Sequence, residues 1–219
     1  MATSIPPHNL GEVVDALVCL LDNPAASVNE LMKHIKGPDF PTGGVICGRD
    51  AIRKGYRTGR SILTVRGKAH SEVTRSGKKL IVITEIPYQI TRSAIKERIA
   101  RAVSAGHIAG IADMRDESGN TGQRLVVELK RDADEHVVLN QLYQHTPLQT
   151  SYSMIMIALV DNRPRTLNLK ELLNCFIAHR VEVIRRRTAF LLKRAQDRAH
   201  IIEGLRIALA HIDEIIELI

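Results

Sequence analysis

The chain has 219 residues and a formal net charge of +7 at pH 7, with no tryptophan and three cysteines. This length allows one or two domains, and an aromatic content of 3% requires a core built from aliphatic side chains. Cys19, Cys47 and Cys175 fit no metal-ligand spacing, no secretory stretch opens the chain, and the apolar runs are too short to span a bilayer, so we expect free thiols, a cytoplasmic protein and no membrane contact.

Local signals in the first third predict short helices followed by strands. Asn9 stands at an N-cap position before a helix over Leu10–Asp22, and Ser27 forms a capping box with Glu30 for a second helix that ends at Gly37. After an irregular stretch, we predict a helix and three strands, the last two joined by a turn at Ser76-Gly77: Arg49–Tyr56, Ile62–Arg66, Ala69–Thr74 and Leu80–Ile86.

From Leu80 onward the predicted order is β-α-β-β-α-β, the split βαβ pattern, which gives an α+β fold. Thr91 caps the first helix, and Asp132 forms a capping box with Glu135 for the second. A turn containing Gly119, Asn120 and Gly122 joins the two middle strands. The six elements are strand Leu80–Ile86, helix Arg92–Ala105, strands Gly110–Arg115 and Arg124–Leu129, helix Ala133–Gln144 and strand Gln149–Leu159.

The last part of the chain predicts one long helix, opened by a capping box of Asn168 and Glu171. Steps of four and three residues give an apolar seam, broken only by Thr188 and Arg198. Its length indicates coiled-coil packing, and an ordinary core-facing amphipathic helix is the alternative. Gly204 weakens its continuity by about 1 kcal/mol. The seam runs through Ile177, Val181, Ile184, Thr188, Leu191, Ala195, Arg198, Ile202, Leu205, Leu209, Ile212, Ile216 and Ile219.

The positive charge is concentrated in two segments. Ten cations and two acids between Arg49 and Lys79 give +8, and seven cations and two acids between Arg180 and Arg198 give +5, which leaves −6 for the rest. In the first segment the glycines allow close backbone approach, so we favour phosphate contact over a solvated surface. The second segment leaves both interpretations open, because a helical arginine stripe can serve solubility alone.

The segment Ile5-Pro6-Pro7-His8-Asn9 is stiffened by two prolines, which hold an aliphatic side chain in an extended loop before a helix. Such a loop suits an apolar wedge between stacked base pairs. Local chemistry alone favours a simpler interpretation, in which Ile5 packs beside the helix start as a hydrophobic staple.

Other chemistries find little support in the sequence. Asp113, Asp116 and Glu117 surround Arg115 and favour ion pairing over a metal site, and the scattered histidines give no ligand spacing. We therefore predict no metal, no bound cofactor and no catalytic residue in this chain. An RNA-recognition module is a further alternative, but its two central strands would have to carry aromatic residues, and Leu80–Ile86 and Arg124–Leu129 contain none.

Several ordered motifs resemble one protein family over essentially the whole chain. They begin with Met1–Val13 and continue through Gly37–Thr42, Tyr56–Arg60, Glu85–Gln89, Arg115–Ser118, Asp197–Ile201 and Ala208–Asp213. The family is the breakage–rejoining A subunit of the bacterial type IIA topoisomerases, DNA gyrase and topoisomerase IV. The segments Glu85–Gln89 and Leu139–Leu148 look more like the gyrase version.

The resemblance implies an internal piece of a longer subunit, cut at both ends. Residues 1–60 would be a DNA-proximal segment, 61–167 an α+β tower domain and 168–219 the root of a coiled-coil arm. The family's DNA-cleaving tyrosine would lie upstream, since Tyr56, Tyr88, Tyr143 and Tyr152 match no position of its active site. DNA contacts are expected from Ile5 as a wedge and from Pro6, His8, Asn9, Arg49, Arg57 and Arg60. The implied partners are double-stranded DNA, a second copy of the A subunit, and a B subunit that binds ATP and Mg²⁺, in an A2B2 enzyme that supercoils DNA.

Overall fold

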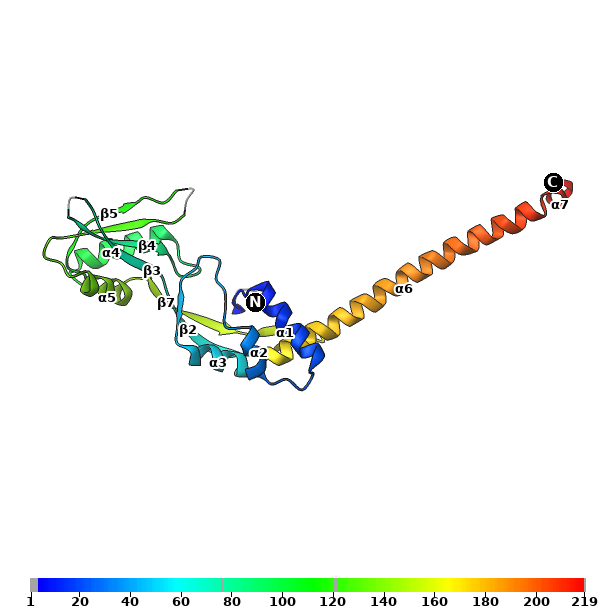
Figure 1. Cartoon of the computed structure of the whole chain (residues 1–219), viewed down its shortest axis with the longest axis horizontal. Coiled ribbons are helices and arrows are strands. Elements are labelled where there is room, and N and C mark those ends of the chain that lie inside the picture. Colours follow the sequence, from blue (N-terminus) through cyan, green and yellow to red (C-terminus); the bar gives the residue numbers. More distant parts are fainter. Residues whose placement is uncertain (1–3, 76, 120–121, 219) are drawn as a thin grey trace. The chain divides into compact units, whose positions relative to one another are not determined.

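The computed structural model describes residues 4–75, 77–119 and 122–218, and these form two compact units that divide after Leu172 (Figure 1). Three residues with a predicted role lie outside this part: Ser76 and Asn120, which we assigned to turns, and Ile219, the last residue of the predicted seam. The finer three-domain division stays a prediction.

The first unit opens with the predicted helices. These are α1 (Leu10–Asp22), α2 (Val28–His34) and α3 (Arg49–Thr58). The side chain of Asn9 accepts hydrogen bonds from the backbone N–H groups of Gly11 and Glu12, at 2.9 and 3.4 Å, which confirms it as the N-cap of α1. The capping box of Ser27 and Glu30 is also confirmed, since each side chain bonds to the backbone N–H of the other residue.

Two antiparallel sheets follow. The first has the order β1-β2-β7 and consists of β1 (Val45–Cys47), β2 (Arg60–Arg66) and β7 (Gln149–Ile155). The second has the order β3-β4-β6-β5 and consists of β3 (Lys68–Val73), β4 (Lys79–Glu85), β5 (Ile111–Asp116) and β6 (Leu125–Leu129). Strand β1 lies in the stretch that we predicted to be irregular.

Gly67 alone separates β2 from β3, so the chain passes from one sheet directly into the other at this residue. A Cβ atom on Gly67 would lie 2.6 Å from Leu148 Cδ1 and 2.7 Å from the carbonyl oxygen of Glu85. Because a core side chain and a backbone carbonyl both lie this close to Gly67, a residue with a Cβ atom would collide with them.

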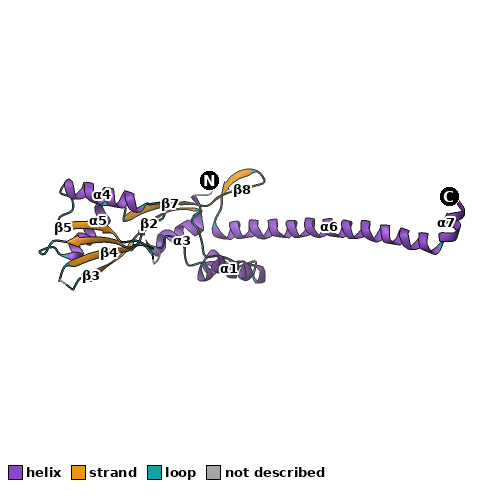
Figure 2. Cartoon of the chain, turned by 90° about the horizontal axis from the view of Figure 1, so that it is seen from above, coloured by secondary structure: helices purple, strands orange, loops and turns teal. Residues whose placement is uncertain are grey.

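The core is aliphatic, as the composition predicted. Helices α4 (Arg92–Ser104) and α5 (Glu135–His145) cover one face of the second sheet (Figures 1 and 2). Ile81 and Ile83 of β4 pack there against Ile95 and Ile99 of α4 and Leu142 of α5, and all five side chains are at most 1% exposed. The predicted α+β class is therefore confirmed.

The predicted closing strand Gln149–Leu159 is wrong as a single element. The strand is interrupted at Met156, whose N–H donates to the carbonyl oxygen of Gly59. Strand β7 pairs with β2 in the first sheet, and β8 (Ile157–Val160) forms a separate hairpin with β9 (Arg163–Thr166). Strand β3 takes the place beside β4 that the split βαβ pattern gives to its last strand.

The capping box predicted at Asp132 is also wrong. Asp134 caps α5 by accepting from the N–H groups of His136 and Val137, at 2.8 and 3.3 Å. Ala133 belongs to a turn, in which its N–H donates to Lys130, and its Cβ lies close to Gly110. Packing of this turn therefore delays the helix start by two residues.

The helix α6 (Leu169–Ala210) continues from the first unit through most of the second. The Asn168–Glu171 capping box is confirmed by two 2.9 Å hydrogen bonds, and Gly204 lies within the helix without breaking it. The helix does break at His211, before α7 (Ile212–Leu218), which the seam pattern did not predict. No helix of the described chain is long and apolar enough to cross a membrane.

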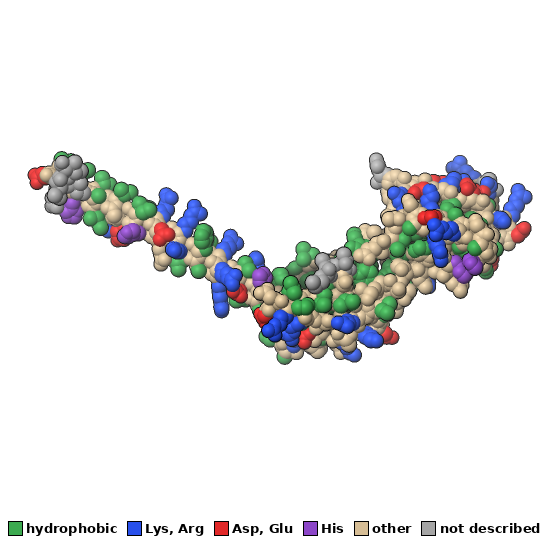
Figure 3. Space-filling view, turned by 180° about the vertical axis from the view of Figure 1, so that it is seen from behind, with side chains coloured by type: hydrophobic (Ala, Val, Ile, Leu, Met, Phe, Trp, Pro, Cys, Tyr) green, Lys and Arg blue, Asp and Glu red, His purple; other side chains and the backbone are tan. Residues whose placement is uncertain are grey.

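Apolar and basic side chains alternate along the surface of α6 (Figure 3). The seam side chains of Leu191, Leu205 and Leu209 are 49%, 59% and 69% exposed. Coiled-coil packing of this seam stays a prediction.

Candidate nucleic-acid interface

The proline-rich segment before α1 is held by hydrogen bonds at three consecutive residues. The carbonyl oxygen of Pro7 accepts from the N–H of Asp39 at 2.8 Å. His8 bridges two partners, with Nδ1 2.8 Å from the carbonyl oxygen of Pro6 and Nε2 2.7 Å from the hydroxyl of Tyr56 on α3. Because a carbonyl can only accept, Nδ1 carries the proton and Nε2 accepts from Tyr56. Burial lowers the pKa of His8 and so keeps the ring neutral.

This anchoring places the predicted DNA-contacting residues of the segment in different environments. Pro6 is buried, and His8 is committed to internal hydrogen bonds. Asn9 is exposed but uses its side-chain oxygen as the cap of α1. Ile5 keeps a partly exposed side chain on the anchored loop. The wedge function of Ile5 and the alternative staple both stay predictions, whereas Pro6 and His8 hold the loop by burial and internal hydrogen bonds.

A groove of about 1040 Å³ lies between α2 and α3. Its lining carries one acid, Asp50, and six cations: Lys33, Lys36, Arg49, Arg53, Lys54 and Arg57. Met32 and Ile52 provide apolar surface within it. In Figure 3 the lysine and arginine side chains are visible along the lower edge of the first unit, where α2 and α3 lie. The groove is therefore strongly cationic.

The periodicity of α3 explains why its arginines line the groove. Arg49, Arg53 and Arg57 are spaced by four residues and share one exposed face of the helix. Ile52 and Tyr56 lie on the buried face. The helix therefore separates an apolar side, which packs on the first sheet, from a cationic side.

Most of the positive charge in the groove is not neutralised. Arg57 donates from Nη2 to the neutral Oδ1 of Asn29 at 2.9 Å, an interaction that leaves its charge available. Arg53 lies 3.6 Å from Asp50, but both side chains are well exposed, so this pair contributes little. Lys33 and Arg49 form no ion pair with any described residue. A polyanion would supply the missing counter-charge.

A second, shallower hollow of about 480 Å³ adjoins the groove and shares Lys36 and Ile52 with it. Asn9 lines this hollow together with Glu12 and Asp39. The structure thus brings the predicted residues Asn9, Arg49 and Arg57 onto neighbouring surfaces. It also adds Lys33 and Lys36 of the α2 region, which we did not predict.

Arg60 does not belong to the groove. Gly59 ends α3 in the left-handed conformation, at φ 75°, and turns the chain into β2. Arg60 then donates from Nη2 to the hydroxyl oxygen of Thr166 in β9, at 3.2 Å. The sequence grouped Arg57 and Arg60 in one basic segment, and the structure separates them onto two surfaces.

The exposed face of the second sheet carries paired charges. Arg115 lies 3.9 Å from Asp113, 3.5 Å from Glu117 and 3.4 Å from Glu128, so the ion pairing expected for Arg115 is present. The neighbouring Glu72 accepts hydrogen bonds from Arg124 and His70. These bonds lower the pKa of Glu72 to about 2, and Arg124 makes the larger contribution. A sheet face covered by such a network, without an aromatic residue on β4 or β6, is not a base-stacking surface.

The four tyrosines are held by burial, hydrogen bonding or ring stacking. Tyr56 and Tyr152 are buried, and the hydroxyl of Tyr143 donates to the carbonyl oxygen of Gly67 at 3.1 Å. Burial raises the pKa of Tyr56, Tyr143 and Tyr152. Tyr88 stacks on Phe40, with ring centroids 5.1 Å apart. A raised pKa makes a phenol harder to activate as a nucleophile, and the absence of a catalytic tyrosine stays a prediction.

An α+β body that carries a groove lined by six cations and one acid has the charge pattern of the class of proteins that bind polyanions. Comparison with known proteins is more specific, because the family model for the A subunit of DNA gyrase/topoisomerase IV matches residues 1–219. The chain belongs to this family. It is 56% identical over its whole length to the DNA gyrase A subunit of Clostridium acetobutylicum, 54% to that of Halalkalibacterium halodurans and 50% to that of Staphylococcus aureus strain MRSA252. It spans 26%, 26% and 25% of these three relatives, about a quarter of their length.

Proposed function

We propose that this chain is the DNA-binding and DNA-bending part of a DNA gyrase A subunit. In the complete cytoplasmic enzyme, two A and two B subunits would pass one duplex through another, with ATP and Mg²⁺ bound by the B subunits. The chain's own contribution would be to hold the duplex and to direct its path. The observation that carries the proposal is the groove between α2 and α3, where six cations meet one acid.

Phosphate contact explains the groove better than solubility does. Cations that serve only solubility are spread over a surface, whereas these converge from two helices on one hollow. Arginine presents a planar fork of donors that matches the oxygens of a phosphate group. Contacts of this kind position a duplex without reading its sequence, so we propose sequence-tolerant binding.

The test is the salt dependence of duplex binding, measured by fluorescence anisotropy with the complete chain. Each neutralised phosphate adds about 0.9 to the slope of log K against log salt. Arg49→Gln with Arg57→Gln should therefore lower the slope by about 2 and weaken binding at low salt. The matched control is Arg185→Gln with Arg186→Gln on α6, which removes the same charge.

Two results would contradict the proposal. One is an equal effect of the two double variants, since the groove would then be no different from any other basic surface. The other is wild-type binding that does not weaken as salt rises. A topoisomerase IV A subunit remains the nearest alternative, and an assembled enzyme that unlinks DNA rings but introduces no supercoils would favour it.

A further inference from the structure

The β8–β9 hairpin lies outside the groove and has an unusual charge distribution. Its two strands pair from Ile157 with Thr166 to Val160 with Arg163, and they form a separate two-stranded sheet. The connecting residues Asp161 and Asn162 both have positive φ, 52° and 60°, as a two-residue type I′ turn requires. The hairpin is therefore a regular, tightly turned β-ribbon.

The pairing register divides the hairpin into two faces. Arg163 pairs with Val160 and Arg165 pairs with Ala158, so both arginines share one face of the ribbon. Both are exposed, and neither forms an ion pair with a residue of the described chain. Arg60 lies at the base of the hairpin and bonds to the hydroxyl of Thr166, which is on the opposite face of the ribbon from the two arginines. The only acid in residues 157–166 is Asp161 at the turn.

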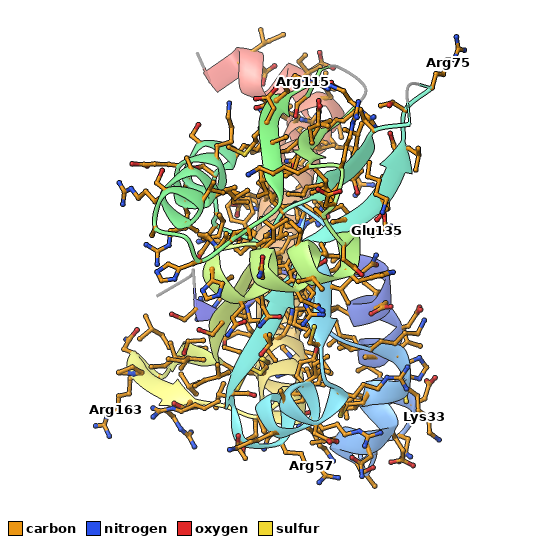
Figure 4. The ribbon with its side chains drawn as sticks, turned by 90° about the vertical axis from the view of Figure 1, so that its left-hand side faces the viewer. Lys33, Arg57, Arg75, Arg115, Glu135 and Arg163 are labelled. Atoms are coloured by element: carbon orange, nitrogen blue, oxygen red, sulfur yellow. The ribbon has the colours of Figure 1, made fainter. Side chains whose placement is uncertain are left out.

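This arrangement differs from that of the cations on the second sheet, where Arg115 and Arg124 are held by carboxylates. The hairpin arginines have no such counter-charge among the described residues. Their surface also differs from the groove, because Figure 4 shows Arg163 and Lys33 extending from opposite sides of the molecule.

The hairpin chemistry selects among possible occupants. A peptide would add to a free strand edge by backbone hydrogen bonds, but Pro164 lacks the N–H that β9 would need there. A two-stranded ribbon fits the major groove of duplex DNA. Two residues along one strand place the arginines about 7 Å apart, so both can bind phosphates of one backbone.

We propose that the β8–β9 hairpin, through Arg163 and Arg165, is a second contact for duplex DNA. It binds phosphates of the duplex backbone that lie outside the α2–α3 groove. This inference rests on the proposed function, because it assumes that the chain binds DNA. It goes further by assigning a separate surface and a ribbon-type contact.

The test compares three proteins by the same salt titration: the complete wild-type chain, Arg163→Gln with Arg165→Gln, and the matched control Lys130→Gln with Arg131→Gln. The control removes two exposed cations that follow β6. We expect the hairpin variant to lower the slope of log K against log salt by about 2, and the control to leave it unchanged. Circular dichroism checks that all three remain folded.

A photo-crosslinking residue in place of Val160, which pairs with Arg163 and therefore lies on the arginine face of the ribbon, gives a second readout. It should form an adduct with duplex DNA in the wild-type background. If the hairpin variant keeps the wild-type slope, or if the residue in place of Val160 gives no adduct, the inference is wrong, while groove binding is tested separately by the groove variant. If the wild-type chain binds no duplex at all, the proposed function itself fails.

Discussion

Replacing Gly59 by alanine tests how α3 is joined to β2, the connection that separates the groove from the hairpin. Gly59 has φ 75°, a conformation that costs an alanine about 1–2 kcal/mol. Its new Cβ would also lie 2.5 Å from the carbonyl oxygen of Leu167 and 2.7 Å from Thr166 Cγ2. Relieving this overlap must move backbone, which adds about 1–3 kcal/mol. Urea unfolding should therefore show a loss of about 2–5 kcal/mol, the sum of the two contributions.

Two other glycines provide the controls. Gly48 has φ 90°, but an added Cβ there would have no atom within 4 Å, so Gly48→Ala should show the conformational cost alone, about 1–2 kcal/mol. Gly204 lies in an exposed part of α6 with open space around it, so Gly204→Ala should instead stabilise the helix by about 1 kcal/mol. If Gly59→Ala costs no more than Gly48→Ala, the predicted collision with Leu167 is wrong.

Three further predictions concern the core, the N-terminal loop and the tyrosines. Ile81→Ala, at a fully buried position, should cost about 2–5 kcal/mol in urea unfolding, whereas Ile62→Ala, at a position 67% exposed, should cost less than about 1 kcal/mol; similar losses would refute the core assignment. Folding lowers the pKa of His8 below 6.5, so below this pH the unfolded chain binds a proton that the folded chain does not. The neutral His8 side chain therefore contributes to stability above pH 6.5, and this contribution is lost as the pH falls below 6.5. Thermal unfolding of His8→Gln should accordingly show a weaker loss of stability than wild type as the pH falls below 6.5, and parallel curves would exclude His8 as the cause. Incubating the chain with supercoiled plasmid, Mg²⁺, ATP and a B subunit should give no covalent adduct on a denaturing gel, and an adduct at Tyr56 or any other tyrosine would overturn that expectation.

The helix starts were predictable because capping is local. At Asn9, Ser27, Thr91 and Asn168, the residue that caps the helix and the N–H groups it satisfies lie within three residues of one another. The same signal failed at Asp132, where a second aspartate two residues later offered an equivalent cap. Packing of the preceding turn, a contact distant in sequence, decided between them.

The arrangement of the strands was less predictable. Residues 149–159 read as one β-forming run, and nothing local shows that the chain leaves the strand at Met156. The decisive contacts are long-range: β7 pairs with β2, and the N–H of Met156 bonds to Gly59. Gly67, where the chain changes sheets, could have been recognised only as a glycine between two strand patterns.

The candidate interface was predicted in part. Arg49 and Arg57 could be placed together because they lie two helical turns apart on one helix. Lys33 and Lys36 were missed, since their position opposite α3 depends on how α1 and α2 fold back. A possible signal was their spacing of three residues near the end of a capped helix. Arg60 does not line the groove because the left-handed turn at Gly59 directs the chain away from it, and its expected DNA contact stays a prediction.

The most direct test of the proposed DNA-bending role is end-to-end energy transfer on a duplex labelled at both ends, with Ile5→Ala placed in the complete gyrase holoenzyme. The loop that carries Ile5 is anchored through Pro7 and His8, so losing part of one aliphatic side chain should leave the fold intact. If Ile5 unstacks a base step, the variant should lose bending, and energy transfer should fall toward the value for free duplex. Energy transfer equal to that of the wild-type enzyme would contradict the wedge and leave Ile5 as a staple beside α1.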